Sequence, residues 1–375
     1  MNSDNNFGTY RKLIAGICAF FCVFALCIGV VYFVLGEQNK IGDESEMVST
    51  EELLQNNSSK TDFETTAVED DSEMSKPENS EEEFESVPEV SEFEKLFYLT
   101  VPEDVTLYSP NVLVYNLTEQ YTVYSKIEHE ICAPASLTKM LTALVALDYI
   151  SYESSVRVGD EIDMIGANSS VAFLQKGSRY KMSTMLEALM LPSGNDAAYS
   201  LAVNAARVHA NDNSLPAEDA VSDFVRLMNE KAKALGCIST CFLSPDGYDA
   251  DGQYTTTEDM LLISIAAYSN AYIKECVSKS VNSQHGWYNS NMLIREDSEY
   301  YNPCVTGLKT GSTDAAGNCV AVSAEIGDAT YIMLFMKSES KNGRFADANT
   351  IIELIKEQLN IEDDSQDVVS ESISQ

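Results

Sequence analysis

The sequence predicts an α+β domain, in which an antiparallel sheet is built from both ends of the domain and helices pack on it. Three observations support this class. Two strand-like runs come first, at 112–117 and 121–126. A long stretch of helical patterns follows, and two further strand-like runs come late, at 318–326 and 330–337. The early and late strands are expected to share one sheet.

The elements of this domain follow one another between clear turn signals. The early strands enclose a turn at 118–120, and Gly327 and Asp328 separate the late strands. The strongest helix is 137–150, and Pro134 near its start suits a first helical turn. Further helices are expected at 184–190, 197–209, 217–235, 257–268 and 347–359.

The N-terminal region carries the pattern of a membrane anchor. Residues 13–36 hold no charge, and at about 1.5 Å per residue they are long enough for a hydrocarbon core of about 30 Å. Arg11 and Lys12 precede the segment, so that 1–12 is expected in the cytoplasm and the remainder outside the cell. A cleaved signal peptide is the alternative, but its apolar region is usually about 7–15 residues long. The length therefore favours an uncleaved, single-pass anchor in the cell membrane.

Two segments flank the domain. Residues 37–96 are rich in Glu, Asp and Ser, and such a composition buries too little apolar surface to fold, so we expect a disordered acidic linker. Residues 360–375 are expected to form a short disordered acidic tail. The folded domain is accordingly placed at 97–359.

Charge and cysteine content restrict the classes of partner. The formal net charge is −35, which argues against nucleic acid because phosphate binding needs clustered Lys and Arg. Six cysteines lie outside the anchor, and the sequence leaves their pairing open. Cys237 and Cys241 have no second ligand pair nearby, so no zinc site is expected.

Ser136 and Lys139 form a Ser-x-x-Lys pattern at the start of the strongest helix. Residues three apart are neighbours on one helix face, so the lysine amine can reach the serine hydroxyl. A serine near a helix N-terminus also has free backbone N–H groups that suit a developing oxyanion. Taken alone, the pattern is more often a helix start with a surface lysine.

Two further patterns change this interpretation. Ser193-Gly194-Asn195 follows, and then Lys309-Thr310-Gly311. Each has an ordinary alternative, a capping turn for the first and the end of a strand for the second. The ordered set Ser-x-x-Lys, Ser-x-Asn and Lys-Thr-Gly is the signature of penicillin-interacting serine enzymes.

The resemblance extends through most of 97–359. The stretches "APASLTKMLTALVAL", "SSVAFLQKG", "ALMLPSGNDAAYSLA", "SPDGYDADGQYTTTEDM" and "VTGLKTGSTDAAGNCVAVSA" resemble the low-molecular-weight penicillin-binding proteins that act as serine-type D-alanyl-D-alanine carboxypeptidases. This resemblance implies the serine β-lactamase/transpeptidase-like fold, an antiparallel sheet flanked by helices plus an all-helical lobe, with the active site between them. Many relatives add a second, β-rich domain and a C-terminal amphipathic helix. This chain departs from them in ending soon after the catalytic domain, with its anchor expected at the N-terminus.

The resemblance also implies catalytic roles. Ser136 is the expected nucleophile, and Lys139 is the expected base. An ordinary lysine, with a pKa of about 10.4, is neutral only about once in a few thousand molecules at pH 7. Burial and a neighbouring cation, Lys309, would lower that pKa. Ser193 is expected to relay a proton to the leaving amine, and Asn195 to hold Lys139 and the substrate amide.

A second group of residues is expected to bind substrate. The backbone N–H groups of Ser136 and Ser312 would form the oxyanion hole. Many relatives have His where this chain has Ser312, which we expect to tune substrate handling. Thr310 and Arg344 would bind the terminal carboxylate, and Gly311 completes the substrate-binding segment. An exposed arginine before a helix is the alternative for Arg344.

The expected activity is removal of the terminal D-alanine from peptidoglycan stem peptides through an acyl-enzyme, with inhibition by β-lactams and with no metal or organic cofactor. The alternatives are a D,D-endopeptidase, a β-lactamase, and a non-catalytic module that senses peptidoglycan or β-lactams. Ser-Gly-Asn disfavours a class A β-lactamase, which has Ser-Asp-Asn. The complete set of six polar motif residues disfavours the non-catalytic module.

Overall fold

The computed structural model describes residues 96–361. The expected cytoplasmic tail 1–12 and anchor 13–36 lie outside the described residues, as do the expected linker up to residue 95 and the expected tail from residue 362. None of the helices in the described range is long and apolar enough to cross a bilayer.

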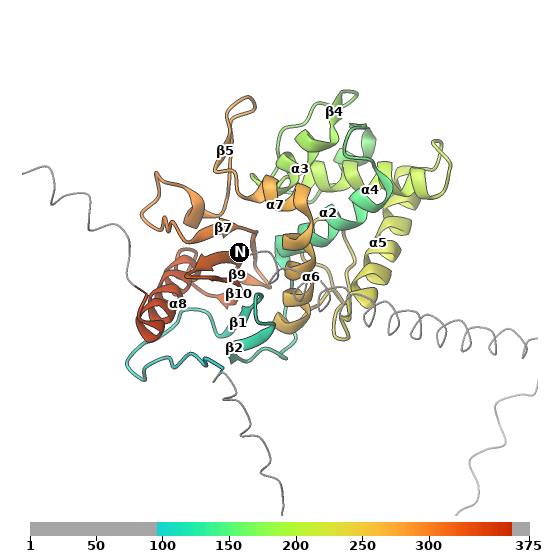
Figure 1. Ribbon diagram of the computed structural model, residues 1–375. Coiled ribbons are helices and arrows are strands. Elements are labelled where there is room, and N and C mark those ends of the chain that lie inside the picture. Colours follow the sequence, from blue (N-terminus) through green and yellow to red (C-terminus); the bar gives the residue numbers. More distant parts are fainter. Residues whose placement is uncertain (1–95, 362–375) are drawn as a thin grey trace, which may run out of the picture. The chain divides into compact units, whose positions relative to one another are not determined.

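Strands and helices alternate in groups along the described chain (Figure 1). In chain order the elements are β1 (Asn111–Asn116), β2 (Tyr121–Lys126), the 3₁₀ helix η1 (Ala135–Leu137), α2 (Thr138–Tyr149), β3 (Ser155–Arg157), the 3₁₀ helix η2 (Asp160–Met164), β4 (Arg179–Lys181), α3 (Met182–Met190), α4 (Asn195–His209), α5 (Ala217–Ala234), α6 (Thr257–Ser269), α7 (Ala271–Val277), β5 (Val281–Asn282), β6 (Trp287–Tyr288), the 3₁₀ helix η3 (Met292–Ile294), β7 (Val305–Gly307), β8 (Thr310–Thr313), β9 (Gly317–Ile326), β10 (Ala329–Ser338) and α8 (Gly343–Leu359).

The main sheet joins the two ends of the domain. Its strand order is β2-β1-β10-β9-β7, β8 also pairs with β9, and every pairing is antiparallel. Strand β1 lies beside β10 with Asn111 opposite Met336 and Asn116 opposite Tyr331. This arrangement confirms the predicted sheet, the early strand pair and the late strand pair.

Both faces of this sheet are buried, because successive side chains of a strand point to opposite faces. In β10, Ile332 and Leu334 belong to the core shared with helices α2 to α6, whereas Met333 and Phe335 belong to the core shared with α8. In Figure 1 the red helix α8 lies on one side of the sheet and the helices α2, α4 and α5 lie on the other. The predicted sheet flanked by helices is therefore present, with a helical lobe on one side.

The structure departs from the sequence predictions in its shortest elements. Strands β3 to β8 each hold two to four residues, too few to show an alternating pattern, and they were not predicted. Helix α8 begins at Gly343, ahead of the predicted Asp347. Asp347 lies within α8, and its carboxylate accepts hydrogen bonds from the backbone N–H groups of Tyr108 and Ser109 at 2.8 and 2.7 Å.

The cysteines whose pairing the sequence left open include four buried thiols, Cys132, Cys237, Cys276 and Cys319. Burial raises the pKa of Cys132 and Cys237 to about 12. Since the thiolate is the reactive form, these two side chains are poor nucleophiles at neutral pH. They serve as small apolar groups of the core.

Candidate active site

The backbone before Ser136 is held in an uncommon conformation. Ala135 has φ +47°, which lies in the left-handed region that residues with a side chain rarely adopt. A Cβ added to Gly247 would lie 1.9 Å from the Ala135 carbonyl oxygen, and one added to Gly311 would lie 3.0 Å from the Ser136 nitrogen. Two glycines therefore let separate segments approach the backbone at Ser136. Strain maintained by surrounding contacts is typical of functional sites.

Ser136 and Lys139 meet as the helical spacing predicted. The Lys139 Nζ atom donates hydrogen bonds to Ser136 Oγ at 2.9 Å and to the Asp246 carbonyl oxygen at 2.8 Å. The lysine is completely buried. Burial lowers its pKa to about 8, while the nearby negative charges of Asp246 and Asp196 act in the opposite direction. A substantial neutral fraction can therefore exist near neutral pH, as a base requires.

Lys309 is a second buried lysine, only 1% exposed, immediately before β8. Its Nζ donates to the Thr310 carbonyl oxygen at 2.9 Å. Burial lowers the pKa of Lys309 well below its ordinary value, and repulsion from Lys139 and Arg344 adds to this effect. Among the described residues, neither buried lysine has a carboxylate within ion-pair distance, so each remains easy to deprotonate.

The Ser-Gly-Asn segment presents a second serine in a constrained turn. Ser193 has φ +64°, and its buried Oγ has no hydrogen-bond partner among the described residues. A Cβ on Gly194 would lie 2.7 Å from the Ala188 carbonyl oxygen, which explains the glycine. Asn195 begins α4 and lines the same cavity as Ser136. A buried hydroxyl without a partner is available for an incoming group.

Asp196 fixes the loop beside this turn, a role that the sequence did not reveal. Its Oδ1 accepts a hydrogen bond from the backbone N–H of Ala172, and its Oδ2 accepts one from the backbone N–H of Leu174, both at 2.9 Å. The backbone N–H of Asn195 donates to the Ser170 carbonyl oxygen at 2.8 Å. The start of α4 and the loop 168–174 are therefore joined by these hydrogen bonds into one wall of the site.

The Lys-Thr-Gly segment is supported from both sides. Thr310 Oγ1 lies 2.6 Å from Ser290 Oγ, and Ser290 is a site residue for which the sequence held no signal. Arg344 lies in the first turn of α8 and is 5% exposed. Its Nη1 donates to the Gly311 carbonyl oxygen at 2.7 Å and to Ser312 Oγ at 2.8 Å. The alternative of an exposed arginine before a helix is therefore wrong.

An open cavity of about 520 Å³ is bordered by one residue from each of the first two motifs and by the segment that follows Gly311. Ser136, Asn195 and Ser312 line it, together with the loops 167–170 and 246–249. Three motifs that are distant in the sequence thus converge on Ser136. The amine of Lys139 donates hydrogen bonds to Ser136 Oγ and to the Asp246 carbonyl oxygen. Asn195 was expected to hold Lys139, but within the described chain the two side chains share no hydrogen bond. The 246–249 loop belongs to the "SPDGYDADGQ" stretch, where the sequence had assigned no role.

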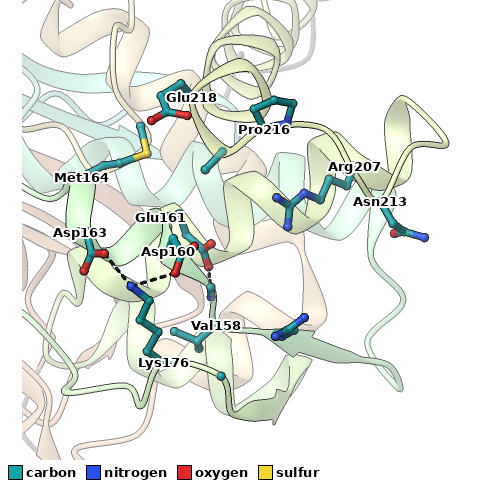
Figure 2. Close-up of a pocket in the computed structure, with 14 residues that line it drawn as sticks. Val158, Asp160, Glu161, Asp163, Met164, Lys176, Arg207, Asn213, Pro216 and Glu218 are labelled. Atoms are coloured by element: carbon teal, nitrogen blue, oxygen red, sulfur yellow. Dashed lines mark hydrogen bonds and ion pairs between the residues drawn. The ribbon is translucent and has the colours of Figure 1, made fainter.

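A larger hollow, of about 740 Å³, lies elsewhere on the helical lobe and contains none of the motif residues. Figure 2 shows its charged lining, in which Lys176 Nζ contacts Asp160 at 2.8 Å and Asp163 at 2.6 Å. The Glu161 carboxylate accepts the backbone N–H of Gly159 at 2.6 Å. These charged groups are paired with one another or with backbone, and the chemistry that the motifs predict is confined to the smaller cavity.

Comparison with known proteins agrees with this geometry. A family model described as D-alanyl-D-alanine carboxypeptidase matches residues 101–340. D-alanyl-D-alanine carboxypeptidase DacF of Bacillus subtilis is 28% identical over 242 residues, which cover 62% of this chain and 58% of that protein. The crystal structure of the Streptomyces K15 DD-transpeptidase superposes with a TM-score of 0.59 at 28% identity, covering 67% of this chain and 97% of that one. Penicillin-binding protein D2 of Listeria monocytogenes, in its ampicillin-bound form, gives a TM-score of 0.55 at 26% identity, covering 68% and 99%.

The chain spans little more than half the length of the curated relatives DacF of Bacillus subtilis and DacA of Escherichia coli. The matched region nevertheless contains every motif residue and exceeds half of the 375 residues. Sequence, fold and site geometry agree, and the chain belongs to the D-alanyl-D-alanine carboxypeptidase family, peptidase family S11.

Proposed function

We propose that the protein is a serine-type D-alanyl-D-alanine carboxypeptidase that removes the terminal D-alanine from peptidoglycan stem peptides and is acylated by β-lactams. The observation that carries the proposal is the completely buried Lys139, whose amine lies 2.9 Å from Ser136 Oγ at the edge of an open cavity. The relatives described as D-alanyl-D-alanine carboxypeptidases support the substrate class.

In this proposal the neutral amine of Lys139 accepts the Ser136 hydroxyl proton while Oγ attacks the carbonyl between the two terminal D-alanines. The oxyanion that forms is stabilised by the backbone N–H groups of Ser136 and Ser312. The C–N bond then breaks, the departing amine receives the proton of the Lys139 ammonium through Ser193, and an ester to Ser136 and a neutral Lys139 remain. Water, deprotonated by Lys139, hydrolyses this ester.

Other side chains hold the substrate. Thr310 binds the terminal carboxylate through a hydroxyl that Ser290 orients at 2.6 Å. Arg344 contributes positive charge from behind β8 and orients Ser312. Asn195, which lines the cavity, holds the substrate amide. Lys309 provides a second buried amine beside Lys139, and burial lowers its pKa well below the ordinary value.

We also propose that the segment 13–36 anchors the protein in the cell membrane with the catalytic domain outside the cell. The uncharged segment and its flanking Arg11 and Lys12 support this topology. The acidic segment 37–96 would then hold the domain away from the bilayer. Protease protection of spheroplasts expressing the protein tests the orientation: external protease should remove the domain and leave a membrane-bound fragment.

The test of the activity is D-alanine release from a stem pentapeptide by the purified full chain, with Ser136→Ala as the matched control. Release by the wild type alone supports both the activity and the nucleophile. Labelling by fluorescent penicillin without release would show a reactive serine with another substrate, and cross-linked muropeptides would then test the endopeptidase alternative. A folded protein that neither releases D-alanine nor becomes labelled would contradict the enzymatic proposal and favour the non-catalytic module.

A transpeptidase is a second candidate, because the structurally similar Streptomyces K15 protein is described as a DD-transpeptidase. The two activities share the acyl-enzyme and differ in whether water or an amine receives the acyl group. Adding glycylglycine to the pentapeptide assay separates them. A carboxypeptidase yields mainly the shortened peptide, whereas a transpeptidase yields the glycylglycine adduct.

A further inference from the structure

The larger hollow of about 740 Å³ on the helical lobe is lined by four separate segments (Figure 2). They are the end of β3 with the 3₁₀ helix η2, the residues before β4, the end of α4 and the start of α5. Helix η2 packs against both α4 and α5. Charged side chains that are distant in the sequence therefore converge on one open hollow, which contains none of the motif residues.

One group of charges in this lining is complete in itself. Lys176 Nζ contacts Asp160 Oδ1 at 2.8 Å and Asp163 Oδ2 at 2.6 Å. The hydrogen bonds to the two carboxylates raise the pKa of Lys176, and the same lysine lowers the pKa of Asp160. Because these three side chains satisfy one another, they offer little to a ligand.

Glu161 is the buried acidic residue of the lining. It is 1% exposed, and its Oε1 accepts a hydrogen bond from the backbone N–H of Gly159 at 2.6 Å. Within the described chain this is the one hydrogen bond that the carboxylate accepts, and it forms no ion pair there. A buried carboxylate without a cationic partner is costly, so an ammonium group in the hollow would stabilise it.

Arg207 supplies the opposite charge from the last turn of α4. It is partly buried, and its Nε donates to the Leu215 carbonyl oxygen at 3.0 Å, whereas its Nη atoms have no partner among residues 96–361. Helix α5 begins in the same lining at Ala217, and Pro216 before it has no side-chain group to cap the first backbone N–H groups. These donors suit a carboxylate. The exposed Glu218 in the same turn weakens the positive potential, so Arg207 carries most of the attraction.

Glu161 and Arg207 line the same hollow but form no ion pair with each other. A ligand with both a cation and an anion satisfies both side chains, whereas an ion of either sign satisfies one and is repelled by the other. A sugar offers hydroxyl groups to both but leaves both charges uncompensated. An α-amino acid, with an ammonium and a carboxylate on one carbon, has the required chemistry.

We propose that this hollow is a binding site for a free α-amino acid, held as a zwitterion between Glu161 and Arg207. The ammonium donates to the Glu161 carboxylate, and the ligand carboxylate accepts hydrogen bonds from the Arg207 Nη atoms and from the N–H groups at the start of α5. D-Alanine belongs to this class, and its choice as the ligand rests on the proposed function, which releases it. The product then binds at one end of α4, the helix that begins with Asn195.

The experiment titrates D-alanine into the purified full chain after acylation with ampicillin and follows binding by saturation-transfer difference NMR. In the proposed function the acyl group occupies the cavity at Ser136, so the signal reports a site elsewhere, and mass spectrometry checks the acylation. We expect a dissociation constant of about 1 mM, the value for two charge-assisted hydrogen bonds. D-Alanine methyl ester lacks the anion and N-acetyl-D-alanine lacks the cation, so each should bind at least about tenfold more weakly.

Two substitutions locate the site. Glu161→Gln keeps an oxygen for the Gly159 N–H but removes the charge, and Arg207→Gln removes the guanidinium. Each should weaken D-alanine binding at least about tenfold. Arg179→Gln changes an exposed arginine of β4 that does not line the hollow, and it should retain the wild-type affinity. Far-UV circular dichroism reports whether each variant is folded.

The outcomes distinguish the hollow from the catalytic activity. No saturation transfer to D-alanine with the acylated wild type would overturn the site and leave the proposed function intact. Equal affinity of the wild type and both hollow variants would also overturn it, as would binding of N-acetylglucosamine in place of D-alanine. Failure of ampicillin to acylate the protein would count against the proposed function alone, and the two variants would then test the hollow in the unmodified protein.

Discussion

The pKa of Lys139 makes the rate of acylation depend on pH in a defined direction. Burial lowers this pKa from the ordinary value of 10.5 to about 8. The neutral amine is the base, so its fraction rises from about one tenth at pH 7 to about one half at pH 8 and nears completion above pH 9. The second-order rate of acylation by fluorescent penicillin should therefore rise about fivefold between pH 7 and pH 8 and then level off.

Asp246→Asn provides the matched perturbation. The negative charge of Asp246 raises the pKa of Lys139 against the effect of burial. Asparagine retains the Oδ1 atom that accepts bonds from Ser244 and Tyr248 and removes only the charge. With less stabilisation of the ammonium form, the pKa of Lys139 falls, and the midpoint of the pH profile should move to lower pH.

Stopped-flow acylation between pH 6 and pH 10 measures both profiles, and far-UV circular dichroism over the same range controls for unfolding. An activity that keeps rising tenfold per pH unit to pH 10 would mean that Lys139 retains an ordinary pKa and that its burial does not activate it. A midpoint that moves to higher pH in Asp246→Asn would refute the electrostatic argument.

Two further substitutions test the contacts that hold the site. Gly247→Ala forces a Cβ against a backbone oxygen at a residue with φ +78°, and it should cost at least about 3 kcal/mol of unfolding free energy, whereas Gly177→Ala, with φ +86° and open space around it, should cost only about 1 kcal/mol. Urea unfolding measures both, and equal losses would contradict the steric argument. Ser290→Ala removes the hydroxyl beside Thr310 Oγ1 and should lower kcat/KM for D-alanine release about fivefold. An unchanged kcat/KM would show that Thr310 needs no such orientation.

The sequence determined the elements with strong periodicity and the identity of the chemistry. Features whose patterns depend on local spacing could be predicted. They are the early and late strands, the helix that begins after Ser136 and the three ordered motifs. The i, i+3 relation of Ser136 and Lys139 is a property of one helical turn, and the structure shows it as a 2.9 Å contact. The expected anchor at 13–36 also follows from local composition and stays a prediction.

The groups that support these motifs became apparent only in the folded structure. Ser290 contacts Thr310 from a segment 20 residues earlier in the chain. The Asp246 carbonyl oxygen accepts a hydrogen bond from Lys139, 107 residues away, and it lies in a loop whose role the sequence did not reveal. Whether a lysine is neutral depends on its burial, and burial is set by how all surrounding segments pack. Arg344 shows the same limit, since sequence allowed an exposed arginine and folding placed it behind β8. The spacing of residues in the sequence predicts single helices and strands. Contacts between distant segments form only when strands from both ends of the domain pair into one sheet.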